Sequence, residues 1–443
     1  MKAYKQRRVF LTLILAMACL LAGCGSPLPV AETRQAEVLQ ATLADWEEDS
    51  LTVVTEEGEY TFAVTEKQLE MEQGLRAGYP VEIYYSGSVG QEDFKLLQAK
   101  VKDFSDCTPA RQAHHLRLVM TLEEKVGQMF MAHWPGDGAQ WLADEYHLGA
   151  YLLFGKDFKE KMPHEVTEEL GDFQRSREIP LLMAVDEEGG IVNRVSRHPQ
   201  YREEPFASPQ EIMANGGLER AKAETVEKCR LLSELKINLN LAPVCDISQN
   251  PDDYIYSRTV GKGAEETAEY ISAVVAAAEG SGVGSCLKHF PGYGGNADTH
   301  TGMVVDNRSY SEFVENDFIP FAAGIEAGAG SVMVSHNIVT CMDDQRPASL
   351  SPEVHRVLRE ELGFEGVIIT DDLTMDGIRH YTGNSEAAVA AVLAGNDLLC
   401  CSDIAAQVPA VLQAVKEGEI EVQSIDQSVE RILRWKIELG IIQ

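Results

Sequence analysis

Polar and ionisable side chains follow four apolar runs of this sequence, at the point where each run ends. A carboxylate in such a place costs free energy to bury unless it is paired, and a single one is more often structural than catalytic. Four run ends of this kind indicate a shared site that combines acidic, basic and hydrogen-bonding groups. The residues at these ends include Asp186, Lys288, His289, Ser335, His336 and Asp371.

A further pair, Asp298 and His300, lies in the loop that follows Lys288 and His289. A carboxylate two residues before an imidazole can fix the tautomer of the ring and raise its basicity, which suits a general acid/base. A solvated loop with a chance Asp-x-His is the simpler explanation of the tripeptide by itself. The pair alone is therefore weak evidence for catalysis.

The elements that must position these residues form a repeating pattern from about residue 120 onward. Eight apolar runs alternate with helix-like segments, and continuous apolar runs are typical of strands buried on both faces of a parallel sheet. The pattern predicts an α/β fold, a TIM (β/α)8 barrel, in which function collects at the carboxyl ends of the strands. An open doubly wound sheet is the alternative, but no glycine-rich phosphate loop follows any run. The runs are residues 128–133, 149–154, 180–185, 237–242, 284–288, 331–335, 366–370 and 396–400.

The first 24 residues read as a lipoprotein signal peptide. Four basic residues precede an apolar run at 9–21, which is shorter than the ~20 residues that a membrane-spanning helix needs. The run ends in LAGC, which resembles the bacterial lipobox, so Cys24 is the expected lipidation site and the protein is expected outside the cytoplasm, anchored to the cell membrane. A secretory signal with a chance cysteine is the alternative. Residues 25–35 read as a tether.

Residues 36–105 predict a small all-β domain that precedes the barrel. The β-rich runs 51–55 and 59–64 are separated by Glu56, Glu57 and Gly58, which is a hairpin signal. Residues 80–85 alternate with period two, and residues 94–101 are expected to form a closing strand. No catalytic constellation occurs there, so residues 116–443 are expected to form the catalytic domain.

Charge and cysteine content exclude two other classes of function. The chain has 70 acidic against 38 basic residues and a formal net charge of −32, which repels phosphate backbones and argues against nucleic-acid binding. The cysteines that follow Cys24 show no paired C-x-x-C spacing, so they are read as small core residues, and no metal site is expected.

Residues 288–300 read KHFPGYGGNADTH. This segment resembles the signature loop of the β-N-acetylglucosaminidase branch of glycoside hydrolase family 3, which carries K-H-F-P-G-x-G followed closely by D-[ST]-H. Every specified position of both motifs is matched. The resemblance extends over about residues 120–440, and with the LAGC segment it indicates a bacterial lipoprotein form of this β-N-acetylhexosaminidase branch. It also includes residues 121–127, 185–190, 241–246, 346–349 and 363–373.

The resemblance implies a role for each matching residue. Asp371 would be the nucleophile, His300 the proton donor and acceptor, and Asp298 the carboxylate that supports His300. Tyr293 and Ile191 depart from relatives that have His and Arg there, which leaves the fine specificity open. The implied sugar-binding residues are Asp186, Arg194, Arg258, Lys288 and His289.

These roles predict a retaining β-N-acetylhexosaminidase. It would cleave terminal β-linked N-acetylglucosamine from cell-wall-derived or chitin-type glycans through a glycosyl-enzyme on Asp371. Its partner is then a carbohydrate substrate, and no metal or organic cofactor is expected.

Three alternatives remain open. The first is a β-glucosidase-type enzyme, although such relatives take their acid/base from a second domain, for which the sequence after the eighth run leaves little room. The second is an N-acetylglucosaminide phosphorylase, since a histidine acid/base lets an anionic phosphate approach. The third is an inactive sugar-binding lipoprotein, which would keep the pocket but lose Asp371 or His300.

Overall fold

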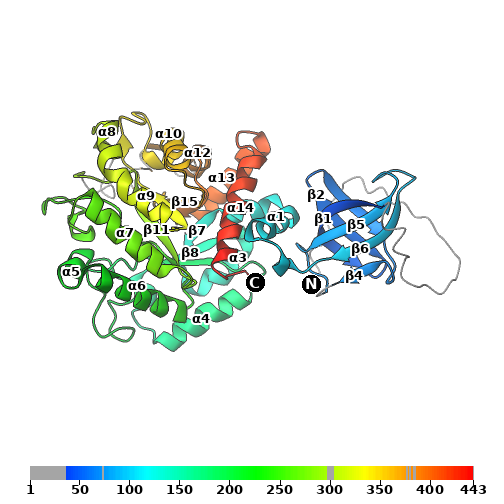
Figure 1. Cartoon of the computed structure of the whole chain (residues 1–443), viewed down its shortest axis with the longest axis horizontal. Helices are drawn as coiled ribbons and strands as arrows, with labels where there is room; N and C mark the ends of the chain where they lie inside the picture. Colours follow the sequence, from blue (N-terminus) through cyan, green and yellow to red (C-terminus); the bar gives the residue numbers. More distant parts are fainter. Residues whose placement is uncertain are drawn as a thin grey trace. The chain divides into compact units, whose positions relative to one another are not determined.

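The computed structural model describes residues 36–71, 74–296, 304–375, 378, 381–382 and 386–442. The chain divides into two compact units, Met1–Met120 and Thr121–Gln443 (Figure 1). Three residues singled out above, Cys24, Asp298 and His300, lie outside the described residues. Within the described part, no helix combines the length and the apolar character needed to cross a membrane.

The first unit contains a six-stranded sheet in the order β3-β2-β1-β5-β6-β4, which confirms the small all-β domain. Neighbouring strands are antiparallel except β4 and β6, which run parallel. The expected hairpin joins β2 to β3, and Gly58 takes a φ of 149° there, a conformation that residues with a side chain rarely adopt. The strands are β1 (Glu37–Glu47), β2 (Ser50–Thr55), β3 (Gly58–Ala63), β4 (Leu69–Met71), β5 (Pro80–Ser86) and β6 (Lys95–Val101).

The core of this unit follows from the period of two along each strand. Leu51 and Val53 of β2 and Val81 and Ile83 of β5 are fully buried, because alternate side chains point to the same face of a sheet.

The helix α1 (Pro109–Val119) belongs to the same unit, and the sequence-based boundary at residue 116 falls within it. Nδ1 of His115 lies 2.6 Å from Oγ1 of Thr42 on β1. Burial lowers the pKa of His115 to about 4, so its ring is neutral at pH 7.

The second unit is built on eight parallel strands, which confirms the predicted TIM barrel. Their order is β15-β13-β11-β10-β9-β8-β7-β16, and a parallel bridge between Ile369 and Leu398 joins the first of these strands to the segment leading into the last. Each of the eight predicted apolar runs overlaps one strand. The strands are β7 (Phe130–His133), β8 (Ala150–Leu153), β9 (Leu182–Val185), β10 (Leu239–Asn240), β11 (Gly284–Phe290), β13 (Ser331–Val334), β15 (Val367–Thr370) and β16 (Leu399–Cys401).

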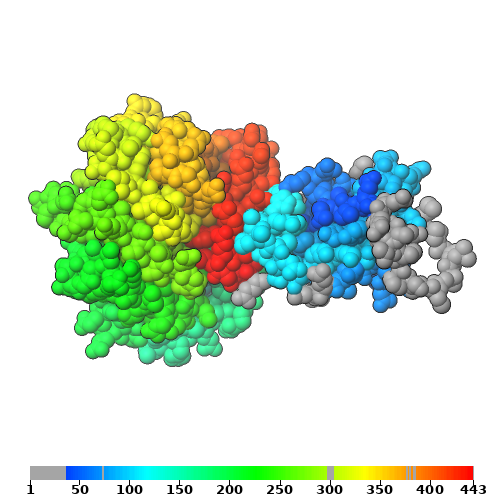
Figure 2. Space-filling model, in the orientation of Figure 1, coloured from blue at the N-terminus to red at the C-terminus, as the bar shows by residue number. Residues whose placement is uncertain are grey.

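Helices follow the strands and cover them, so that every residue of β8, β9, β13 and β15 is buried (Figure 1). The unit opens with α2 (Leu122–Gln128), which begins with a capping box between Thr121 and Glu124. In Figure 2 the orange and red surface regions lie side by side, in agreement with the packing of α12 on α13. The main outer helices are α3 (Ala139–Tyr146), α4 (Pro163–Arg175), α6 (Gly217–Glu234), α7 (Ala264–Ala278), α9 (Phe318–Glu326), α10 (Pro352–Arg356), α12 (Glu386–Ala394), α13 (Ile404–Glu417) and α14 (Val422–Glu438).

Candidate active site

The carboxyl end of the barrel brings together the described candidate residues. Asp186 follows β9, Lys288 and His289 lie near the end of β11, and Asp371 follows β15. Parallel strands end at the same rim, so these side chains share one mouth. The N–H of Asp371 donates to the carbonyl of Val334 at 3.1 Å, which extends the ladder and fixes the backbone of Asp371 at the rim.

Two buried thiols of the barrel are influenced by the negative charges of both Asp371 and Asp186. Burial raises the pKa of Cys286 on β11, and the negative charges of Asp186 and Asp371 raise it further. The same two carboxylates, after burial and Asp372, raise the pKa of Cys400 on β16. Both carboxylates therefore act on the same interior points of the barrel, from strands on different sides of the ring.

Lys288 forms the centre of a buried ion network in the mouth. Its Nζ donates to Oδ1 of Asp186 at 2.8 Å and lies 2.6 Å from Oε1 of Glu188. Burial alone would lower the pKa of Lys288, but the charges of Asp186 and Glu188 outweigh burial and raise it above its ordinary value. Lys288 is therefore a fully charged donor that two carboxylates hold in one place.

Glu188 also binds Arg258 in a bidentate pair. Nε of Arg258 donates to Oε2 at 2.9 Å, and Nη2 donates to Oε1 at 2.7 Å. Burial alone would raise the pKa of Glu188, but Lys288 and Arg258 lower it well below its ordinary range. Sequence reasoning did not select Glu188 as a site residue, although its position two residues after Asp186 was an available signal.

His289 is held by a second carboxylate that the sequence did not single out. Oδ2 of Asp246 accepts from Nδ1 of His289 at 2.7 Å, and Oδ1 of Asp246 accepts the N–H of Tyr293 at 2.7 Å. Nη2 of Arg258 lies 3.3 Å from Nε2 of His289. Because an arginine can only donate, this contact suits a ring that accepts at Nε2 and carries a proton on Nδ1. The ring of Tyr293 packs edge-on against His289, with centroids 5.7 Å apart.

Arg194 lies on a loop whose backbone is held by hydrogen bonds to the side chain of Glu187. The fully buried carboxylate of Glu187 accepts the backbone N–H groups of Arg194, Val195 and Ser196 at 2.8, 2.7 and 3.0 Å. Nη2 of Arg194 then lies 3.9 Å from Oδ2 of Asp186. Its Nε is buried and has no hydrogen-bond partner among the described residues, so this donor is unsatisfied.

The residue after Asp371 is fixed from several sides. Asp372 donates its N–H to Oδ1 of Asp371 at 2.8 Å, and its carbonyl accepts from Nε2 of His336 at 3.0 Å. Its Oδ1 accepts from the N–H and hydroxyl of Thr374 at 2.9 and 2.6 Å, while Oδ2 lies 2.8 Å from Nε2 of His133. Burial alone would raise the pKa of Asp372, but the contacts with His133 and Thr374 outweigh it and lower the pKa.

A hydrogen bond joins Asn296 to Asp306 in the part of the chain that follows β11. Nδ2 of Asn296 donates to Oδ2 of Asp306 at 2.7 Å, and Asp306 lies in the short strand β12 (Val305–Asp306).

The barrel unit is similar in sequence to a known family and to several named proteins. Residues 121–435 match the family model described as the glycosyl hydrolase family 3 N terminal domain. A β-hexosaminidase of Nitrosomonas eutropha is 32% identical over 262 residues, which cover 58% of this chain and 74% of that protein. The β-hexosaminidase LpqI of Mycobacterium tuberculosis is 31% identical over 310 residues, which cover 67% of this chain and 78% of that protein.

Solved structures of similar proteins superpose on this chain. A glycoside hydrolase family 3 β-N-acetylglucosaminidase from Paenibacillus sp. str. FPU-7 superposes with a TM-score of 0.68 at 32% identity, over 73% of this chain and 63% of that chain. M. tuberculosis LpqI superposes with a TM-score of 0.67 at 26% identity, over 74% of this chain and 95% of that chain.

Proposed function

This chain belongs to glycosyl hydrolase family 3, and we propose that it is a retaining β-N-acetylhexosaminidase. Its substrates would be glycans of cell-wall or chitin type that end in β-linked N-acetylglucosamine. One observation carries the proposal, namely that Asp371 shares the barrel mouth with the network of Asp186, Lys288, Glu188 and Arg258. The names of the relatives, β-hexosaminidase and β-N-acetylglucosaminidase, support it.

The proposed reaction has two steps on opposite faces of the sugar ring. Asp371 attacks the anomeric carbon while protonated His300 gives its proton to the leaving glycosidic oxygen. Neutral His300 then takes a proton from the water that attacks the glycosyl–Asp371 ester. Asp298 stabilises the imidazolium that donates its proton in the first step and is restored in the second. The roles of His300 and Asp298 rest on the sequence resemblance alone.

In this proposal the charged residues of the barrel mouth bind the sugar. Lys288 and Arg258 are charged and already oriented by carboxylates, so they need little reorganisation to bind hydroxyl groups. The partly exposed side chains of Arg194 and Asp186 add a donor and an acceptor. The two cations Lys288 and Arg258 balance the two carboxylates Asp186 and Glu188, so this four-residue network suits a neutral sugar. His289 completes the set beside Arg258.

The first experiment compares chromogenic β-N-acetylglucosaminide with the matching β-glucoside, each with and without added phosphate. We expect hydrolysis of the N-acetylglucosaminide at a rate that phosphate does not change, with free sugar as the product. Release of a sugar phosphate would identify a phosphorylase instead. Preference for the glucoside would point to a β-glucosidase, and no turnover of any substrate would point to a sugar-binding protein.

A second experiment tests the proposed proton donor. His300→Ala should slow the glycosylation step strongly on substrates with poor leaving groups but only weakly on nitrophenyl glycosides, which leave without protonation. An equal loss on both kinds of substrate in that step would contradict the role of His300.

We also propose that the protein is held outside the cytoplasm by a lipid on Cys24, which rests on the LAGC segment after a short apolar run. Cys24→Ser should move the protein from the membrane fraction to the soluble secreted fraction. Unchanged fractionation would show that the lipobox resemblance is a coincidence.

A further inference from the structure

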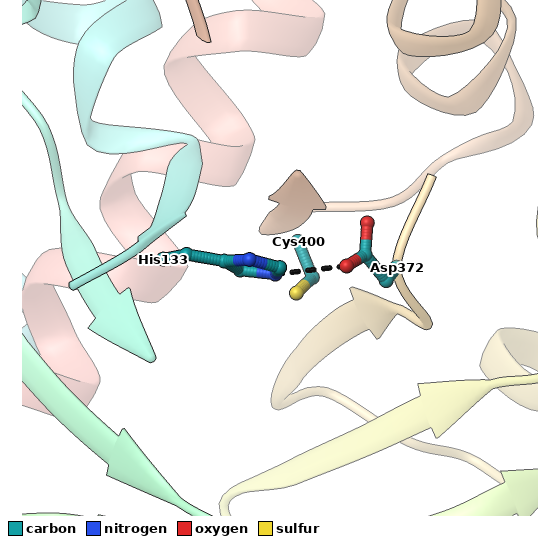
Figure 3. Close-up of side chains that lie close together, drawn as sticks. All are labelled: His133, Asp372 and Cys400. Atoms are coloured by element: carbon teal, nitrogen blue, oxygen red, sulfur yellow. Dashed lines mark ion pairs between the residues drawn. The ribbon is translucent and has the colours of Figure 1, made fainter. Parts of the chain in front are cut away.

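Three side chains of different ligand type lie close together, and one of them, Asp372, follows Asp371 directly in the sequence (Figure 3). His133 ends β7, Asp372 follows β15, and Cys400 lies on β16 between them, where it pairs in register with Met131 of β7. One nitrogen, one oxygen and one sulfur atom from these residues all lie within 4.8 Å of one another. Asp372 and His133 are partly exposed, with side chains 21% and 29% accessible, whereas Cys400 is buried.

We propose that His133, Asp372 and Cys400 bind a single zinc ion. Imidazole nitrogen, carboxylate oxygen and thiolate sulfur together suit Zn²⁺, whereas Mg²⁺ and Ca²⁺ prefer oxygen ligands alone. Tetrahedral Zn²⁺ with bonds of about 2.0–2.3 Å holds its ligand atoms about 3.3–3.8 Å apart. Small side-chain movements reach that spacing from the observed one, and water from the open mouth completes the fourth position.

Among the described residues, no hydrogen bond from outside the cluster is made to the three proposed ligand atoms. Nε2 of His133 is buried, and its 2.8 Å contact is with Oδ2 of Asp372, another atom of the cluster itself. Thr374 holds the other oxygen of Asp372, which leaves Oδ2 facing the cluster. Cys400 is a free thiol, and its proton would pass to solvent when the metal binds.

Occupancy of this site would inhibit the enzyme. Asp372 is the neighbour of Asp371 and donates its N–H to that carboxylate at 2.8 Å. A divalent cation on Asp372 therefore adds positive charge beside the proposed nucleophile, stabilises its resting anion and slows its attack. This consequence rests on the proposed function, whereas metal binding does not.

The binding test is a titration of the full chain with Co²⁺, a spectroscopic substitute for Zn²⁺. We expect one Co²⁺ per chain, a thiolate-to-cobalt charge-transfer band in the near ultraviolet, and loss of the band when Zn²⁺ is added. Cys400→Ser should abolish the band, and His133→Gln should weaken Zn²⁺ binding at least about 10-fold. Circular dichroism checks that each variant folds.

Cys401→Ser is the matched control, because Cys401 is the next residue of β16 and points to the opposite face of the sheet. It should keep both the band and the affinity. Absence of the band in the unmodified protein, its persistence in Cys400→Ser, or an equal loss in Cys401→Ser would each overturn the proposed site.

The inhibition test adds Zn²⁺ to the hydrolysis assay. We expect inhibition that a chelator reverses, and Cys400→Ser should keep its basal activity while losing the inhibition. Inhibition of equal strength in Cys400→Ser would overturn the link to this site. If the protein proves to have no hydrolase activity, the proposed function fails, but the Co²⁺ titration still decides whether the metal site exists.

Discussion

The two ends of the barrel both bury charged networks, but the networks differ in how completely they are satisfied. At the amino end, just before β16, the fully buried carboxylate of Asp397 accepts from Ser428 at 2.8 Å and from Arg431 at 3.0 Å through Oδ1. Its Oδ2 accepts from the N–H of Ile368 at 2.9 Å and from Arg359 at 2.5 Å. Donors occupy both oxygens of this carboxylate.

The carboxyl end lacks that saturation. Asp186 has a side chain that is 16% accessible, and Arg194 is 29% accessible with a buried Nε that has no partner among the described residues. The contrast teaches that burial of charge does not by itself mark a functional site. A saturated network stabilises the fold, whereas one with open donors and acceptors can bind a ligand.

The largest effect should come from the mouth. Asp371→Asn keeps an oxygen that can accept the N–H of Asp372 but removes the nucleophile, so kcat/KM should fall by at least about 10³-fold with little change in stability. Steady-state kinetics and thermal unfolding together measure this. Activity above a few per cent would assign the nucleophile to another residue.

The opposite end should show the reverse pattern. Asp397→Asn leaves Arg359 and Arg431 without their charged partner, so the free energy of unfolding should fall by about 3–5 kcal/mol. The folded fraction should keep its kcat/KM. The control is Asp172→Asn, which breaks an exposed pair with Arg175 and should cost less than about 1 kcal/mol in urea unfolding. Similar losses in the two variants would show that saturation of the Asp397 network adds nothing.

A third test uses the pH dependence of stability. Burial lowers the pKa of Lys436 to about 7, and its Nζ donates to Oε1 of Gln128 at 2.8 Å. The unfolded state keeps this proton up to about pH 10.4, so between those values it binds more protons than the folded state and stability rises with pH.

Lys436→Met should therefore reduce that slope by up to about 1.4 kcal/mol per pH unit, measured by urea unfolding across this window. Lys416→Met is the control, because Lys416 is exposed with a side chain 54% accessible. Equal slopes in the two variants would mean that Lys436 stays charged when folded.

The smallest effect should come from the edge of the mouth. Arg194→Gln removes the unpartnered donor, and we expect KM to rise about 10-fold while the free energy of unfolding changes by less than about 0.5 kcal/mol. Arg175→Gln on α4, 70% accessible, should change neither quantity. A loss of stability without a change in KM would make Arg194 a structural residue like those of the Asp397 network.

The barrel could be predicted from the sequence because its strands are buried on both faces and therefore read as continuous apolar runs. The strand β1 gave no such run, since only part of Glu37–Glu47 faces the core. Asp186, Lys288 and Asp371 could be predicted because they lie at the carboxyl ends of strands, where the active site of such a barrel is expected. Glu188 and Asp246 bind partners 70 and 43 residues away, and such pairing leaves no local pattern.

The cluster of His133, Asp372 and Cys400 could not be predicted for the same reason. The spacing of its members along the chain matches no metal motif, and only the closed ring of strands brings β7, β15 and β16 together. The sequence-based expectation that the cysteines are small core residues considered them one at a time.

Because β7 pairs with β16, the barrel can close only after β16 has been synthesised. β7 is made first among the barrel strands and pairs with β8, but its other edge waits for Leu399–Cys401, near the end of the chain. Until those residues leave the ribosome, the nascent sheet has two open edges that can pair with another chain. A frameshift or deletion that removes β16 therefore yields an aggregation-prone chain rather than a weakened enzyme, even though every residue of the Lys288 network is intact.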